Sequence, residues 1–245
     1  MAANAKKPHL LVTKARQRTP LSKRSEFQVF EGQPRRGTPT VVKKTVESHP
    51  HPRAVATAKL HIGGYGRVSP DIRKPRHLAT YVGLDGRVLH VTERVTPLLK
   101  FRNVRGVRKP SVSTPLLLKA VPDIVSQLVK AREHSPLVNP SLANWGVDKE
   151  GRMVLMHTGT MSSGLRQQLL TLVQDLKAVK PKAYKKARSL MVDELSKTKG
   201  RKSAEHEVAF VEWWLRELQD PEVQARFARD PRFAKTLIMK LVKKT

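Results

Sequence analysis

The chain contains no cysteine along its 245 residues. This absence excludes disulfide bonds, thiolate zinc sites and cysteine nucleophiles, and it suits a reducing compartment. Aromatic residues are also scarce, at 5%. No apolar run approaches the roughly 18 to 20 residues that a membrane-spanning helix needs, so we expect no membrane span.

Acidic residues are the other marked shortage. The chain has 20 Asp and Glu against 48 Lys and Arg, which gives a formal net charge of +28 at pH 7. Residues 1–112 carry 24 basic and 6 acidic residues, whereas residues 113–245 carry 24 and 14. A charge this large repels itself and is normally neutralised by a polyanion, most often the phosphates of a nucleic acid.

Residues 1–58 have the composition of an extended basic arm. Proline recurs through the segment, and the apolar residues come in short groups with no sustained helical or strand period. Such a segment buries too little apolar surface to offset its conformational entropy, so we expect it to be ordered only by a polyanion outside the chain. The first 25 residues contain no acidic residue, and Glu26 is the first in the chain. They are typical either of an organelle transit peptide or of an RNA-binding tail.

Residues 59–112 combine a small β unit with a second basic segment. Two β-prone runs flank the turn residues Gly83–Gly86, and they predict a hairpin over 77–95. Residues 96–112 return to the style of the arm and predict an extended, Arg-rich strap, because they offer no apolar helix face. Arginine grips phosphates bidentately and stacks on bases, so the strap suits RNA. A merely solvated run of charge is the alternative.

The arm, the β unit and the strap supply the predicted RNA-binding residues. All are lysines or arginines, the side chains that neutralise phosphate. The set is Lys6, Lys7, Lys14, Arg16, Arg18, Lys23, Arg24, Arg35, Arg36, Lys43, Lys44, Arg53, Arg67, Arg73, Lys74, Arg76, Lys100, Arg102, Arg105, Arg108 and Lys109.

The second half of the chain has helical periodicity around one further hairpin. We divide it into a helix and hairpin at 113–160 and a helical domain at 161–245. Possible helix starts occur at Thr114–Pro115 and again at Pro122–Asp123, and Ser203 is predicted to cap a later helix. Two further starts, at Asp220–Pro221 and Asp230–Pro231, complete the pattern. The fold class is therefore α+β: an extended basic N-terminal arm, small β-hairpin units and a C-terminal helical domain.

Few residues could carry catalysis. His90 and His157 end β-prone runs, and His206–Glu207 lacks the second histidine of a zinc-protease motif. Asp193 and Glu194 are adjacent on a helix and point about 100° apart, which is a poor acid and base pair. We therefore predict no enzymatic activity, no catalytic residue, no metal site, no cofactor and no small-molecule substrate.

In layout, the whole chain resembles ribosomal proteins, particularly the enlarged ones of mitochondrial ribosomes. These combine a long Pro-punctuated basic arm, a Gly- and Arg-rich β unit, a basic strap and a compact helical domain. The resemblance implies a structural RNA-binding subunit of a ribonucleoprotein. Its arm and strap would neutralise and bridge ribosomal RNA, and its helical domain would contact neighbouring ribosomal proteins. It also favours the mitochondrial matrix over the cytoplasmic ribosome or the nucleus.

Other functions with the same charge remain open. A chromatin or nucleocapsid protein would package nucleic acid without sequence preference, and an accessory factor would serve an RNA-processing complex. An RNA-modifying enzyme with a basic feeder arm is a third possibility, and it predicts a cofactor pocket.

Overall fold

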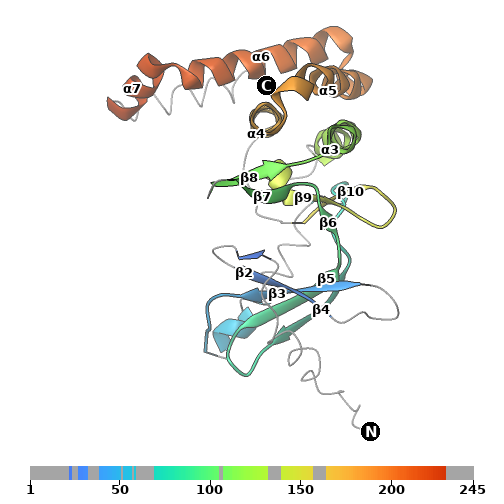
Figure 1. Cartoon of the computed structure of the whole chain (residues 1–245), viewed down its shortest axis with the longest axis vertical. Coiled ribbons are helices and arrows are strands. Elements are labelled where there is room, and N and C mark those ends of the chain that lie inside the picture. Colours follow the sequence, from blue (N-terminus) through green and yellow to red (C-terminus); the bar gives the residue numbers. More distant parts are fainter. Residues whose placement is uncertain are drawn as a thin grey trace. The chain divides into compact units, whose positions relative to one another are not determined.

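The computed structural model describes residues 22–23, 27–32, 39–50, 52–56, 58, 69–104, 107–131, 139–156 and 164–229. These residues combine antiparallel sheets with helices, which confirms the α+β class (Figure 1). They fall into two compact units. The first draws on residues 1–67 and 74–95, and the second on residues 68–73 and 96–245. The predicted boundaries at 58, 112 and 160 do not coincide with the boundaries of these units.

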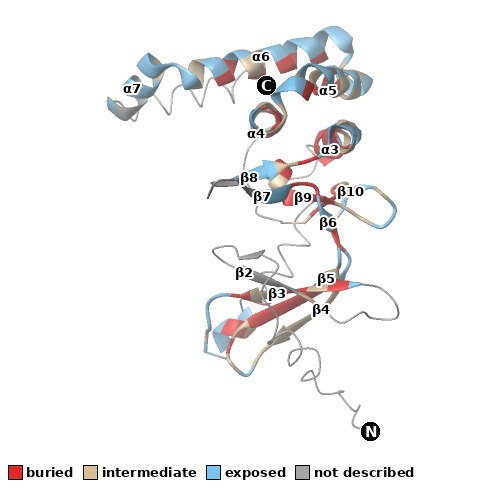
Figure 2. Cartoon of the chain, in the orientation of Figure 1, coloured by how far each residue is buried: buried red, intermediate tan, exposed pale blue. Residues whose placement is uncertain are grey.

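The first unit is built on one antiparallel sheet of five strands in the order β1-β2-β3-β5-β4. Interior strand β5 pairs with β3 on one side and with the edge strand β4 on the other, and five of its six residues are buried (Figure 2). The strands are β1 (Ser22–Lys23), β2 (Phe27–Glu31), β3 (Thr40–Thr45), β4 (His77–Val82) and β5 (Val88–Glu93).

The hairpin predicted over 77–95 is confirmed. Its turn places Gly86 at a φ of 69°, which glycine adopts without strain. The same glycine touches the backbone of His49, because a Cβ added there would lie 2.0 Å from the His49 carbonyl oxygen. The turn is thereby fixed against the segment that follows β3, where the His49 amide donates to the Gly86 carbonyl at 3.0 Å.

Strands β2 and β3 lie in the stretch for which the sequence predicts an extended arm. The register pairs Phe30 with Val42, and Val42 with Val91 of β5. Val42 is buried with Leu89 and Val91, so a few apolar residues suffice where a neighbouring strand supplies the rest of the core. The prediction fails for residues 27–31 and 40–45 because strand pairing is not a local property. Residues 1–21 lie outside the described residues.

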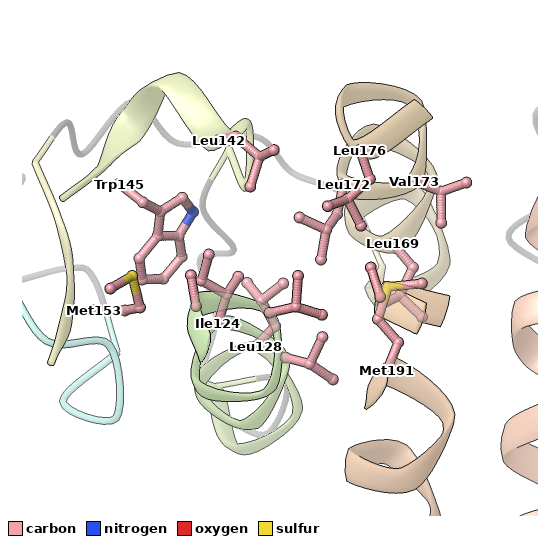
Figure 3. Close-up of a cluster of buried hydrophobic side chains, with 14 of the residues drawn as sticks. Ile124, Leu128, Leu142, Trp145, Met153, Leu169, Leu172, Val173, Leu176 and Met191 are labelled. Carbon is pink, nitrogen blue, oxygen red and sulfur yellow. The ribbon is translucent and has the colours of Figure 1, made fainter. Parts of the chain in front are cut away.

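In the second unit, 29 buried apolar residues among those that the structure describes form one core cluster. Trp145 and Met153 of a short hairpin pack on one side of helix α3, and residues of helices α4 and α5 pack nearby (Figure 3). The elements of this unit are β6 (Thr96–Pro97), β7 (Lys100–Val104), β8 (Val107–Ser111), α3 (Thr114–Ala131), η1 (Leu142–Asn144), β9 (Trp145–Val147), β10 (Met153–Leu155), α4 (Leu165–Val179), η2 (Pro181–Ala183), α5 (Tyr184–Lys199), α6 (Arg201–Gln219) and α7 (Pro221–Arg229).

Helix α3 continues through Pro122, although Pro122–Asp123 has the form of a helix start. The Asp123 carboxylate instead forms hydrogen bonds with residues outside α3. It accepts two hydrogen bonds from Arg73 Nη1, at 2.9 and 2.8 Å, and one from the amide of Met153 at 2.9 Å. These bonds tie α3 to β10 and to the segment before β4, so tertiary contacts decide the role of Asp123.

Two other helix predictions change at their boundaries. Helix α6 begins at Arg201 with Gly200 as its N-cap, so Ser203 lies inside the first turn and is not the cap. The helix predicted after Asp220 is confirmed as α7, in which the Asp220 carboxylate accepts a hydrogen bond from the amide of Glu222 at 2.8 Å. The last predicted helix, at 231–243, lies outside the described residues.

Candidate anion-binding sites

The predicted strap is a β-hairpin rather than an extended segment. Strands β7 and β8 form a two-stranded sheet that joins no other strand among the described residues. We call residues 100–111 the basic ribbon, because they contain five Lys and Arg and no acid. The sequence offers no apolar helix face, and this excludes a helix. It is compatible both with an extended strap and with two paired strands, and the structure has the paired strands.

The register of the basic ribbon places two cations at opposite positions, because Arg102 is paired with Lys109. Like charges at directly opposite positions of an antiparallel pair are destabilising. A two-stranded hairpin is also only marginally stable in water by itself. An anion between the opposed cations would remove the repulsion, so the ribbon has the electrostatics of a polyanion contact.

The base of the basic ribbon is anchored in the core of the second unit. Leu98 and Leu99 precede β7 and Val112 follows β8, and all three are buried. The amide of Leu98 donates to the carbonyl of Trp145 at 2.9 Å. Lys100 and Lys109 are exposed, and Phe101 retains 46% of its accessible surface. The ribbon is therefore held at one end, while Lys100, Lys109 and the ring of Phe101 are exposed to solvent.

A second basic site lies where α5 passes into α6. A shallow depression of about 1050 Å³, largely open to solvent, lies there, and we call it the α5–α6 basic cavity. Its walls combine backbone of the turn at Gly200 with charged side chains of both helices. The residues that line it are Arg188, Lys199, Gly200, Arg201, Lys202, Ser203, Glu205, His206 and Ala209.

The cations of this cavity differ in how they are partnered. Arg188 Nε lies 3.0 Å from Glu212 Oε2, and Arg201 Nε lies 3.3 Å from Glu205 Oε1. Lys199 Nζ is 3.7 Å from Glu207 Oε2, a carboxylate that Arg166 holds more closely. Lys202 has no carboxylate within salt-bridge distance among the described residues. Glu205 is the single acid in the lining, so the cavity has an excess of positive charge.

The first turn of α6 adds backbone donors to the same cavity. The Gly200 carbonyl accepts the first intrahelical bond, from the amide of Ala204 at 3.0 Å. The amides of the three residues before Ala204 then have no intrahelical acceptor. Glycine offers no side chain to cap them, and the first turn holds no acid. The positive end of the helix dipole thus coincides with two basic residues, Arg201 and Lys202, an arrangement that an anion would stabilise.

The other predicted RNA-binding residues are scattered. Lys43 and Lys44 lie in β3, half-buried, and Arg53 is exposed in the short helical turn at 52–56. Burial lowers the pKa of Lys74, whose neighbours Arg73 and Arg76 are exposed. Lys23 lies in β1, and Lys100, Arg102, Arg108 and Lys109 lie in the basic ribbon. Lys6, Lys7, Lys14, Arg16, Arg18, Arg24, Arg35, Arg36, Arg67 and Arg105 lie outside the described residues.

Sequence reasoning missed the α5–α6 basic cavity as a site. The run from Lys197 to Lys202 is visibly basic, and it predicts an exposed loop. In the structure Lys197 to Lys199 end α5 and Arg201 begins α6, so only Gly200 separates the helices. This sharp connection brings Arg188, eleven residues before Lys199, into the same cavity. The Lys-Gly-Arg-Lys sequence, with glycine between two helical patterns, is the signal that could have revealed it.

The residues considered for catalysis are spread over β5, α5 and α6 where the structure describes them. His90 is buried in β5, where Nδ1 lies 2.8 Å from Thr80 Oγ1, and this oxygen lies 2.7 Å from His77 Nε2. His206 lines the α5–α6 basic cavity, whereas Asp193 and Glu194 form ion pairs with Arg201 and Lys197. His157 lies outside the described residues. Within the described ranges no three metal-ligating side chains gather. No described helix has the length and apolarity needed to cross a membrane.

Comparison with known proteins gives likenesses to solved structures only. No protein-family model and no curated protein sequence matches the chain. Among the solved structures that resemble it is one titled "Structure of vaccinia related kinase 3". The two share 13% sequence identity with a TM-score of 0.43, over 72% of this chain and 71% of that chain. A likeness at this level assigns neither a fold nor an activity to this chain.

None of these comparisons supports the function predicted from the sequence. The layout predicts a non-enzymatic structural subunit of a ribosome, whereas one of the matching solved structures carries the name of a kinase. We withdraw both the ribosomal role and the exclusion of enzymatic activity. A basic composition reports the charge of a partner, and it does not decide whether a fold carries a catalytic site. The mitochondrial location stays a prediction, because residues 1–21 lie outside the described residues.

Proposed function

We propose that this chain binds single-stranded RNA and that the basic ribbon is its principal contact. The observation that carries the proposal is the register of β7 and β8, which places Arg102 opposite Lys109 in a hairpin with no acidic residue. The proposal concerns the ligand alone. It assigns the chain to no particular assembly and is independent of whether the chain also has an enzymatic activity.

The exposed ring of Phe101 favours unpaired nucleotides over a duplex. Phe101 lies between Lys100 and Arg102 in sequence and is 46% exposed. Bases stack on aromatic rings only where they are unstacked from one another, which is the state of single strands and loops. Proteins that bind single-stranded nucleic acid usually combine basic residues, which contact the phosphates, with aromatic rings, on which the bases stack.

The test is fluorescence anisotropy of the full chain with a labelled single-stranded RNA at several salt concentrations. The triple variant Lys100→Gln, Arg102→Gln, Lys109→Gln removes three phosphate contacts. We expect its affinity to fall by at least about tenfold, and the slope of log K against log salt to decrease by roughly 2, at about 0.7 per phosphate on a single strand. Phe101→Ala should weaken binding by about 1 to 3 kcal/mol and leave the salt slope unchanged.

The matched control removes three charges elsewhere. Lys182, Lys185 and Lys186 are exposed on η2 and α5, away from the basic ribbon and outside the α5–α6 basic cavity. Their triple replacement by glutamine should change the affinity by less than about threefold, because the local phosphate contacts remain. Equal losses in the two triple variants would mean that net charge alone drives binding, and the ribbon would not be the site. Tighter binding to a duplex than to the single strand would also contradict the proposal.

A further inference from the structure

We propose that the α5–α6 basic cavity is a separate binding site for a small ligand that carries several phosphate groups. The proposal does not depend on RNA binding, since the residues involved lie on helices α5 and α6 and not in the basic ribbon. Three properties of the cavity carry it: the convergence of cations, the electrostatic conflict at the start of α6, and the chemistry and size of the lining.

Cations from two helices face one cavity. Arg188 and Lys199 come from α5, Arg201 and Lys202 come from α6, and Glu205 is the one acid in the lining. Glu212, which pairs with Arg188, does not line the cavity, whereas Glu205, which pairs with Arg201, does. Lys202 is exposed and has no carboxylate in salt-bridge range among the described residues. An anionic ligand would find one unpaired ammonium group and guanidinium groups already oriented.

The start of α6 breaks a rule that helices normally follow. Acidic or capping residues usually occupy the first turn, where they stabilise the positive end of the dipole. Here the cap is Gly200, at a φ of 76°, and the next two residues are Arg201 and Lys202. Repulsion between these cations and the dipole destabilises the free protein. Departures from local rules of this kind are expected where a ligand supplies the missing interaction.

The lining indicates what kind of anion fits. Ala209 is its only apolar side chain, and His206 supplies its only aromatic ring. Charged side chains therefore predominate in the lining, and the cavity would recognise charge before a ring. Its volume of about 1050 Å³ is far larger than a single phosphate needs. A compact molecule with several phosphates matches both the volume and the number of cations.

The test is isothermal titration calorimetry on the full chain, with tripolyphosphate and orthophosphate as probes at one fixed ionic strength. We expect tripolyphosphate to bind at least about tenfold more tightly than orthophosphate, because it reaches more cations at once. Lys202→Gln should weaken tripolyphosphate binding by about tenfold. Ser203→Asp should abolish binding and raise the melting temperature, since a carboxylate in the first turn replaces the ligand's charge.

Lys186→Gln is the matched control, because it removes one exposed charge from α5 outside the cavity. It should leave tripolyphosphate binding within about twofold of the original. Equal weakening by Lys186→Gln and Lys202→Gln, or equal affinities for the two probes, would overturn the proposal in favour of unspecific charge attraction. Absence of binding by the unaltered chain would overturn it as well. Binding that Ser203→Asp leaves unchanged would place the ligand elsewhere.

Discussion

Asp85 shows how a single residue fixes the turn between β4 and β5. Its carboxylate accepts a hydrogen bond from Lys44 Nζ at 2.8 Å and a longer one from the amide of Arg87 at 3.3 Å. Burial by itself would raise the pKa of Asp85, but these hydrogen bonds and the charges of Lys44 and Arg87 outweigh it and lower the pKa below 3.8. Folding therefore favours the ionised carboxylate.

The sign of this shift gives a pH prediction. A carboxylate whose pKa is lowered by folding stabilises the protein above its ordinary pKa, and the stabilisation disappears as the pH falls through the folded-state value. Asp85→Asn should lower the free energy of unfolding at pH 7 by at most about 1 kcal/mol, because the pair is partly solvated. The difference from the unaltered chain should shrink as the pH falls below 3.8 and vanish only below the folded-state pKa.

Urea unfolding at several pH values, followed by a signal from the first unit, measures this difference. Asp193→Asn is the control, because Asp193 is an exposed acid in the second unit, 3.9 Å from Arg201. It should leave the first unit unaffected at every pH. A loss of stability in Asp85→Asn that is independent of pH would show that the charge of Asp85 is not what stabilises the turn.

At the scale of elements, helices α4 and α6 are joined by an ion pair with little access to water. Arg166 Nε lies 2.5 Å from Glu207 Oε1, and the two side chains are 13% and 8% exposed. The Arg166 guanidinium also stacks over the ring of Phe210, 4.7 Å from its centroid. Removing one partner of a buried pair leaves an uncompensated charge, which costs more than the pair contributes.

Glu207→Gln should therefore reduce the free energy of unfolding by about 3 kcal/mol. The double variant Arg166→Met, Glu207→Leu should regain most of this loss, because no buried charge remains. Chemical denaturation of both single variants and the double variant forms a double-mutant cycle that isolates the coupling. If the single and double variants were equally destabilised, packing rather than charge would be the cause.

The elements also show where local sequence signals succeed. The turns at Gly83–Gly86 and after Asp148, and the start of α7 at Asp220, were predictable because hydrogen bonds within a few residues determine them. The course of α3 through Pro122 was not, because Arg73 and the Met153 amide, far along the chain, engage Asp123.

At the scale of the molecule, the two units have very unequal cores. Among the described residues, the second unit buries 29 apolar residues in one cluster, whereas the first has two clusters of three. Stability rises with the apolar surface that a unit buries, so the first unit should unfold at the lower temperature. Each core belongs to one unit, which predicts two transitions in differential scanning calorimetry rather than one.

Core truncations assign these transitions. Leu89→Ala should lower the temperature of the first transition alone, and Leu172→Ala that of the second alone. Such truncations reduce the free energy of unfolding by about 2 to 5 kcal/mol. Both residues are at most 2% exposed, so the comparison is well matched. A single transition that both variants shift would mean that the units unfold together.

The sequence by itself determined the sign of the charge, the two hairpins with their turns, and most of the helices. These features follow from composition and from contacts between near neighbours in the chain. It predicted basic residues for anion binding without showing which of them come together. Only the tertiary structure joined β3 to β5, paired Arg102 with Lys109, and brought Arg188 to the turn at Gly200. Register and helix packing depend on residues far apart in sequence, and no local pattern encodes those contacts.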